Sequence, residues 1–163
     1  MIQGVKVQVL ERKEGIDFNL LALVKAKLML DSNLKDYDEL INTEIGNAIE
    51  RIEAFTGLAI GEQTRRVSYS VLDEPDNLPY GPYLSTVSVA TGGIVDSFGL
   101  VTANWSTGGT VIYTCGYSPD TLPKGLLSAV MTAAAEFTGL KPDMVKNGWK
   151  SIAAPFSTRT WAD

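Results

Sequence analysis

The residue types that most often carry out chemistry are scarce in this sequence. It contains no histidine, so the commonest general base and metal ligand is missing. Its one cysteine, Cys115, lies in a run of alternating apolar residues, which favours a small buried side chain over a nucleophile. The glycine patterns of serine hydrolases and of nucleotide-binding loops do not occur. We therefore expect no catalytic residues, no cofactor and no metal.

Three clusters of charged residues could be taken for a catalytic or ligand-binding site. For each of them a structural role is the better explanation. The acidic stretch Asp36–Glu39 opens a predicted helix, where carboxylates complement the helix dipole. The acidic loop Asp73–Asp76 lacks the spacing and the closing glutamate of a calcium loop. The pair Arg65-Arg66 lies in a predicted strand, so the two side chains point to opposite faces and cannot clamp a phosphate together.

The bulk composition is that of a globular chain. Its 163 residues are 45% hydrophobic and 20% charged, with a formal net charge of −5, and we expect a single domain over residues 1–163. The acidic balance argues against a surface that grips nucleic acid, which needs clustered lysine and arginine. No apolar run approaches the roughly 20 residues of a membrane span, and the N-terminus lacks a signal-peptide core. We expect no membrane contact and synthesis in the cytoplasm.

Helical periodicity and capping residues mark three helices. Asn19 is the predicted cap of a short helix that runs to about Leu30. A long helix is predicted from Asp36 to Gly57, with an apolar stripe that ends at Phe55 and with Glu50, Arg51 and Glu53 on its other side. Pro123 lies in the first turn of a third helix, which stops at Gly139.

Alternating residues between the second and third helices predict a β-rich middle. Strands are expected over 64–72 and 84–90, and 94–105 is expected to pair with 109–115 around a glycine turn. The fold class is therefore α+β, with a core of two long packed helices and a short N-terminal helix. A small antiparallel sheet or set of hairpins is inserted between the long helices. We divide the chain into an N-terminal arm (1–15), a core (16–140) and a C-terminal tail (141–163).

Three features indicate contact with another subunit. The third helix carries small side chains that let a second backbone approach closely, the arm alternates like a strand that could add to a neighbour's sheet, and the tail holds large aromatics. The tail either folds back on its own domain or docks on another chain. The predicted interface residues are Val5, Val7, Val9, Ala129, Ala133, Ala135, Trp149, Phe156 and Trp161.

The order of these elements resembles the head–tail connector (adaptor or head-completion) proteins of long-tailed double-stranded DNA phages and prophages. The resemblance runs from about Leu20 to Gly139, and its most specific part is Tyr113–Tyr117 followed by a proline-started helix. The arm before Gly15 and the stretch after Lys141 match no pattern of the family. The other matching segments are Leu20–Leu28, Asp38–Ile41, Phe55–Gly57, Gln63-Thr64, Leu78-Pro79, Pro82 and Val87–Val89.

The resemblance implies a structural role at the head–tail junction of a virion. Proteins of this family form a ring, expected here as a dodecamer, beneath the portal, where they extend the DNA channel and join the capsid to a tail or stopper protein. DNA passes through such a ring without sequence-specific binding, and no residue is catalytic. The alternatives are another virion assembly part, such as a stopper or tail-completion protein, or a small ligand-binding or enzymatic domain.

Overall fold

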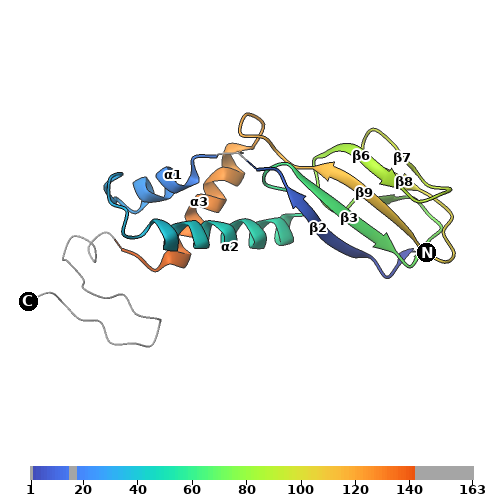
Figure 1. Cartoon of the computed structure of the whole chain (residues 1–163), viewed down its shortest axis with the longest axis horizontal. Coiled ribbons are helices and arrows are strands. Elements are labelled where there is room, and N and C mark those ends of the chain that lie inside the picture. The colour runs from blue at the N-terminus through green and yellow to red at the C-terminus, as the bar shows by residue number, and fades with distance from the viewer. Residues whose placement is uncertain (1, 15–17, 142–163) are drawn as a thin grey trace, which may run out of the picture. The chain divides into compact units, whose positions relative to one another are not determined.

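The computed structural model describes residues 2–14 and 18–141, and Figure 1 shows its helices and strands. The fold class is α+β, as predicted. The chain divides into two compact units. The β unit comprises the chain up to Phe18 and Ile52–Pro123, and the helical unit comprises Asn19–Arg51 and the chain from Lys124. The expectation of a single connector domain stays a prediction.

The helical unit contains α1 (Leu20–Lys27), α3 (Lys124–Thr138) and the greater part of α2 (Asp38–Thr56). Helix α1 packs on α3, which buries Val130 and Ala134, and Arg51 of α2 lies over the Phe137 ring at 4.8 Å from its centroid. Gly139 ends α3 in the left-handed conformation, as predicted. No described helix is long and apolar enough to cross a membrane.

The predicted cap of α1 is wrong in its mechanism. Asn19 does precede the helix, but its backbone is left-handed (φ 56°) and its side chain makes no capping hydrogen bond. An N-cap residue normally has extended backbone angles, which aim its side chain at the free amides of the first turn. The left-handed angles of Asn19 do not provide that geometry.

A four-stranded antiparallel sheet dominates the β unit. Its strands are β2 (Lys6–Arg12), β3 (Gln63–Tyr69), β9 (Gly109–Cys115) and β6 (Tyr83–Val89), in the order β2-β3-β9-β6. The period-two pattern of the sequence is confirmed, because alternate side chains of β3 and β9 are buried. The arm was expected as a strand, and β2 is that strand, paired with β3 at one edge of the sheet.

Short strands complete the β unit. Strands β5 (Asp76–Asn77), β8 (Leu100–Thr102) and β7 (Ile94–Val95) form a second sheet, and β1 (Ile2–Gln3) pairs with β4 (Val71–Leu72). Leu72 of β4 and Val101 of β8 share one apolar core with the inner face of the large sheet, and Val95 of β7 packs against it. The buried members of that core are Ala59, Val67, Tyr69, Leu72, Val101, Trp105, Val111, Tyr113 and Cys115.

The glycine of the Tyr113–Tyr117 motif allows a close backbone approach at the end of β9. Gly116 has a φ of 119°, and a Cβ atom built there would lie 2.1 Å from the carbonyl oxygen of Gly61. Its own amide donates to Pro82 O, and the next amide, of Tyr117, donates to Ala59 O. Any side chain at position 116 would separate these segments, so the motif is explained by packing.

Two expectations about the β-rich middle need correction. The segment 94–105 does not pair with 109–115, because β7 and β8 pair with each other while β9 lies between β3 and β6. Asp96 closes the β7–β8 turn, since its Oδ1 atom accepts from the amides of Phe98 (2.8 Å) and Leu100 (2.9 Å). The predicted core of two long helices with inserted hairpins also underestimates the sheet, which includes the arm and three long strands of the middle.

Candidate interaction surfaces

The last turn of α2 places a carboxylate inside the β unit. Glu53 is only 2% exposed, and both of its oxygens are fully engaged. Its Oε1 atom accepts from the Ile60 amide (2.8 Å), Gln63 Nε2 (2.8 Å) and Arg12 (3.2 Å). Its Oε2 atom accepts from Arg12 (2.9 Å) and Arg65 (3.1 Å). A carboxylate held by this many donors is an anchor and has no free lone pair for proton transfer.

The donors of this cluster come from three separate segments. Arg12 ends the edge strand β2, Arg65 lies in the middle of β3, and Ile60 belongs to the loop between α2 and β3. The Arg65 guanidinium also stacks on the Tyr80 ring, 3.6 Å from its centroid. The Glu53 cluster therefore ties the end of α2 to an edge and to the interior of the sheet.

The expected faces of α2 are wrong at two positions. Glu53 was placed with the exposed charges Glu50 and Arg51, and it is buried. Phe55 was placed at the end of the apolar stripe, and it is 92% exposed. One sequence signal indicated a buried acidic residue, because Arg65 shares a strand face with the apolar Val67 and Tyr69. A cation buried on that face requires an acidic partner, and Glu53 is that partner.

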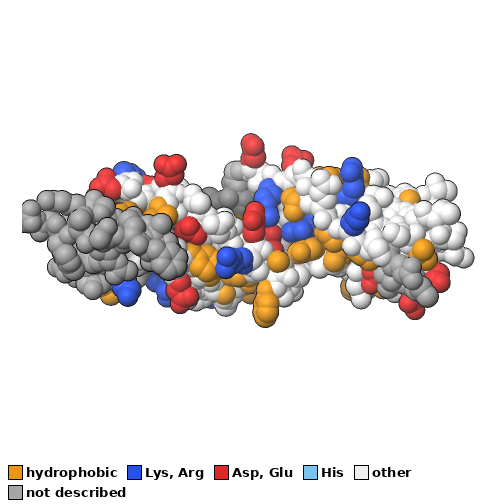
Figure 2. Space-filling model, turned by 90° about the horizontal axis from the view of Figure 1, so that it is seen from below, with side chains coloured by type: hydrophobic (Ala, Val, Ile, Leu, Met, Phe, Trp, Pro, Cys, Tyr) orange, Lys and Arg blue, Asp and Glu red, His pale blue; other side chains and the backbone are white. Residues whose placement is uncertain are grey.

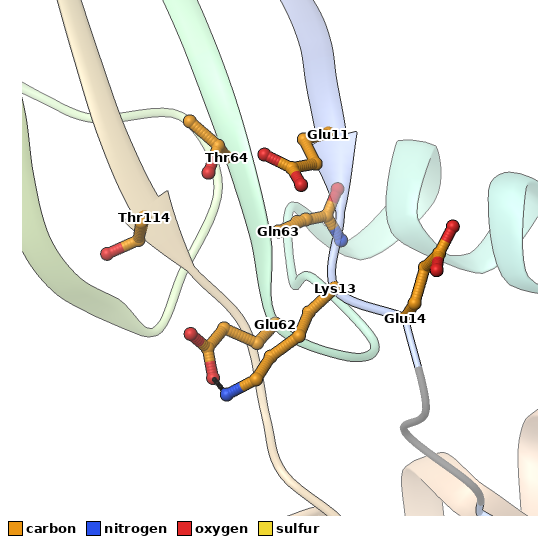
Figure 3. Close-up of a pocket in the computed structure, with 7 residues that line it drawn as sticks. All are labelled: Glu11, Lys13, Glu14, Glu62, Gln63, Thr64 and Thr114. Atoms are coloured by element: carbon orange, nitrogen blue, oxygen red, sulfur yellow. Dashed lines mark hydrogen bonds and ion pairs between the residues drawn. The ribbon is translucent and has the colours of Figure 1, made fainter.

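A shallow hollow of about 280 Å³ opens beside this cluster, where β2 and β9 end and β3 begins (Figure 3). Lys13 and Glu62 form an ion pair of 2.9 Å there, and Glu14 points away from that pair (Figure 3). The described residues contain no group of three side chains suited to a metal ion. The hollow has mixed charge, and its geometry supports no specific ligand. Its lining residues are Glu11, Lys13, Glu14, Glu62, Gln63, Thr64 and Thr114.

The two other reactive candidates of the sequence have structural roles. Cys115 is fully buried, and burial raises the pKa of its thiol to about 11, although nearby Arg65 acts in the opposite direction. The thiol is therefore protonated at neutral pH and inert as a nucleophile. In the acidic stretch at the start of α2, Asp38 forms an ion pair with the buried Lys25 of α1.

Large apolar side chains are exposed along both edges of the four-stranded sheet. On the β2 side, Val5 is 43% and Val7 is 37% exposed. On the β6 side, Leu84 is 49% and Val87 is 60% exposed. Within the described residues of this sheet, β2 pairs only with β3, and β6 pairs only with β9. Large apolar side chains that gather at the edge strands of a sheet usually mark a surface that binds another chain.

The predicted interface residues differ in their accessibility. Val5 and Val7 are exposed, whereas Val9 is half-buried. On α3, Ala129 is exposed and Ala133 half-buried. Ala135 is buried and lines a hollow with Leu28 and Leu140 of the helical unit. The tail residues Trp149, Phe156 and Trp161 lie outside the described residues.

Sequence reasoning missed the apolar side chains at the β6 side of the sheet. Leu84 and Val87 were assigned only to a predicted strand over 84–90, and Ile94 and Phe98 only to the segment 94–105 that was expected to pair with 109–115. Ile94 and Phe98 are 70% and 87% exposed. The signal that could have found Leu84 and Val87 is the presence of apolar residues on both faces of a strand. A strand that buries one face on its own core needs apolar residues on that face alone, so apolar residues on the second face indicate a further contact.

Charged side chains form no field of one sign on the face shown in Figure 2, where acidic and basic residues are interspersed among apolar and neutral ones. This pattern agrees with the small formal net charge of −5. An extended cationic surface of the kind that holds DNA by counterion release is not visible there.

Comparison with known proteins shows a shared fold. No protein-family model and no curated protein matches the chain. Among solved structures, a chain of the virion of a native gene transfer agent particle matches with a TM-score of 0.64 and 18% identity, covering 92% of this chain and 89% of that one. A chain from the neck of the empty particle, computed with C6 symmetry, has a TM-score of 0.63 and 17% identity over 93% and 90%. A chain from the neck of the native particle, computed with C12 symmetry, matches with a TM-score of 0.57 and 18% identity, and the match covers 91% of this chain and 90% of that one.

Proposed function

We propose that this chain is a structural component of the neck of a phage-like virion. The observation that carries the proposal is the likeness to neck chains of a gene transfer agent particle, which spans more than nine-tenths of this chain and about nine-tenths of theirs. A match of that extent covers both units and the order of their elements. The exposed apolar edges of the sheet and the exposed alanine of α3 provide surfaces for assembly.

The finer role that we propose is a head–tail connector. Copies of the chain form a ring, with twelve subunits, beneath the portal and extend the channel through which DNA passes without sequence-specific binding. The C6 and C12 symmetries used for the two neck structures support a ring. A tail or stopper protein binds the far side. The chain acts through its surfaces, without catalysis or a cofactor, and its place is the virion.

The predicted subunit contacts follow from this role. Val5, Val7, the exposed Ala129 and the half-buried Ala133 offer surface in the described chain, and the sequence of the tail adds the apolar residues Trp149, Phe156 and Trp161. A cyclic ring joins two different patches of each subunit, so a contact on α3 and a contact on the sheet can serve opposite neighbours.

A stopper or tail-completion protein is the second candidate, because a neck contains such parts as well and a likeness to neck chains does not separate them from a connector. The discriminating property is the partner. A connector binds the portal directly, whereas a stopper or tail-completion protein binds the connector or the tail.

Native mass spectrometry of the purified chain, alone and mixed with its candidate portal protein, tests the proposal. We expect a closed ring of about twelve copies, or a monomer that adds to the portal in that number. Ala129→Arg should lower the amount of ring, because it places a cation on a close-packed face, while Thr121→Arg in the exposed turn before α3 should leave it unchanged. A chain that stays monomeric and ignores the portal would contradict the connector role.

A further inference from the structure

The two edge strands of the four-stranded sheet contain bulges that share one property. In β2 the register shifts between Val9 and Glu11, so Leu10 has no partner residue on β3. In β6 it shifts between Tyr83 and Ser85 and between Thr86 and Ser88, which leaves Leu84 and Val87 without partners on β9. Each unmatched residue is therefore a large aliphatic one, and all three are exposed, at 39%, 49% and 60%.

Edge bulges normally protect a sheet from unwanted pairing, together with charged residues or proline at the edge. Here the bulged positions carry leucine and valine instead. A bulge also redirects the side chain of the extra residue. The bulges of β2 and β6 thus present apolar side chains to solvent, and such side chains at defined edge positions indicate a contact surface.

The topology makes the two edges complementary. Each neighbouring pair in the order β2-β3-β9-β6 is antiparallel, so β2 and β6 run in opposite directions. The two strands have the same length, seven residues each. When copies are related by rotation around a ring, the β6 edge of one copy meets the β2 edge of the next in antiparallel orientation. That arrangement continues the alternation of the sheet from subunit to subunit.

We infer that the bulged edge of β6 in one copy of this chain packs against the bulged edge of β2 in the next copy. Leu84 and Val87 provide one side of the contact, and Leu10 with Val5 and Val7 provides the other. This inference rests on the proposed ring and specifies its subunit interface. The two patches differ, as a cyclic assembly requires. Because β2 and β6 lie at opposite edges of the same sheet, neither edge can pair with the other within one copy.

The polar residues that flank the two edges permit this contact. The strand β6 contains no charged residue, and on the outer face β2 presents Lys6, Gln8 and Glu11, so the approach of the two edges brings no like charges together. Because one of the two strands is uncharged, the apolar edge side chains associate without a desolvation penalty from opposed like charges. The occupant that matches length, direction and charge is a second copy of this chain.

Cysteine crosslinking tests the pairing. The variant Leu10→Cys/Val87→Cys is treated with a short bismaleimide, in solution at high concentration and in purified particles that contain it. We expect a ladder of crosslinked multimers at about tenfold or more above control, because neighbouring edges hold the two thiols at millimolar effective concentration. The wild-type chain is a natural blank, since its one cysteine is buried. Leu10→Cys/Asp120→Cys, with its second thiol in the exposed turn between β9 and α3, is the matched control.

The single variants give the second readout. Leu10→Cys alone and Val87→Cys alone should each stay uncrosslinked, whereas a mixture of the two should yield dimers. Dimers from either single variant would mean that like edges meet, and this would overturn the inference. If the particles contain several copies of the chain but the double variant yields no ladder of crosslinked multimers, the inference is also overturned, while the proposed function stands. If the double variant yields the ladder in solution but the chain is absent from particles, the result supports the interface and contradicts the proposed role in the virion.

Discussion

The β unit buries Glu53 together with Arg65, the helical unit buries Lys25, and the partners of Glu53 and Lys25 differ in kind. Glu53 of the β unit is held by two guanidinium groups, an amide side chain and a backbone amide. Lys25 of the helical unit is only 4% exposed, pairs with Asp38 and donates to the carbonyl oxygens of Ser32 (3.4 Å) and Leu34. One cluster is built from side chains on three segments, and the other largely from a single linker.

The sequence distance between the partners explains what each cluster does. The donors to Glu53 lie as far away as Arg12 and Arg65, so the cluster can form only when α2, β2 and β3 have come together. The acceptors of Lys25 lie within the 32–38 segment that leads from α1 to α2. The Glu53 cluster therefore contributes to the cooperative stability of the β unit, and the Lys25 cluster fixes a local turn.

The largest effect is expected from Glu53→Ala. This change leaves Arg12 and Arg65 without their carboxylate, and Arg65 is buried, so the free energy of unfolding should fall by about 3–5 kcal/mol. Urea denaturation followed by circular dichroism measures the loss. Glu50→Ala, at an exposed site on the same helix, should change stability by less than about 0.5 kcal/mol. Equal effects of the two changes would show that the Glu53 cluster stabilises nothing.

A smaller loss is expected from Lys25→Met. The methionine fills most of the buried volume, and the Asp38 carboxylate, whose Oδ1 atom is buried, still has the exposed Lys35 at 3.9 Å from its Oδ2 atom when Lys25 is replaced. We expect a loss of about 1–2 kcal/mol, which is the cost of unpaired acceptors. Lys27→Met, on the exposed side of α1, is the control. A loss as large as that of Glu53→Ala would contradict the distinction between the two units.

The sequence predicted the elements that depend on local patterns. Gly57 and Gly139 end α2 and α3 in left-handed conformations because no other residue adopts them so easily, and this rule needs no tertiary information. The alternation in β3 likewise gave the correct buried face. Strand order was not predictable in this way, because β9 could pair with any neighbour that shows the same alternation.

The interaction surfaces were only partly predictable for a related physical reason. Val5 and Val7 stood out because they alternate with polar residues in a short N-terminal segment. Leu84 and Val87 did not, because their exposure results from bulges, and a bulge depends on the register between β6 and β9. Glu53 was misplaced because helical periodicity describes one apolar stripe and contains no information on a carboxylate that pairs with distant arginines.

The smallest effect is expected from Arg12→Gln, and it should be local. The Arg12 side chain is 43% exposed, and Arg65 still pairs with Glu53 after the change, so the free energy of unfolding should fall by about 1 kcal/mol or less. Amide hydrogen exchange should nevertheless become faster along β2, because Arg12 ties this edge strand to α2, while the amides of the central strand β9 keep their protection. Lys13→Gln, which removes an exposed ion pair with Glu62, should alter neither readout measurably. Uniformly faster exchange in β2 and β9 would mean that Arg12 stabilises the whole β unit, and the Glu53 cluster would then hold the edge and the centre of the sheet equally.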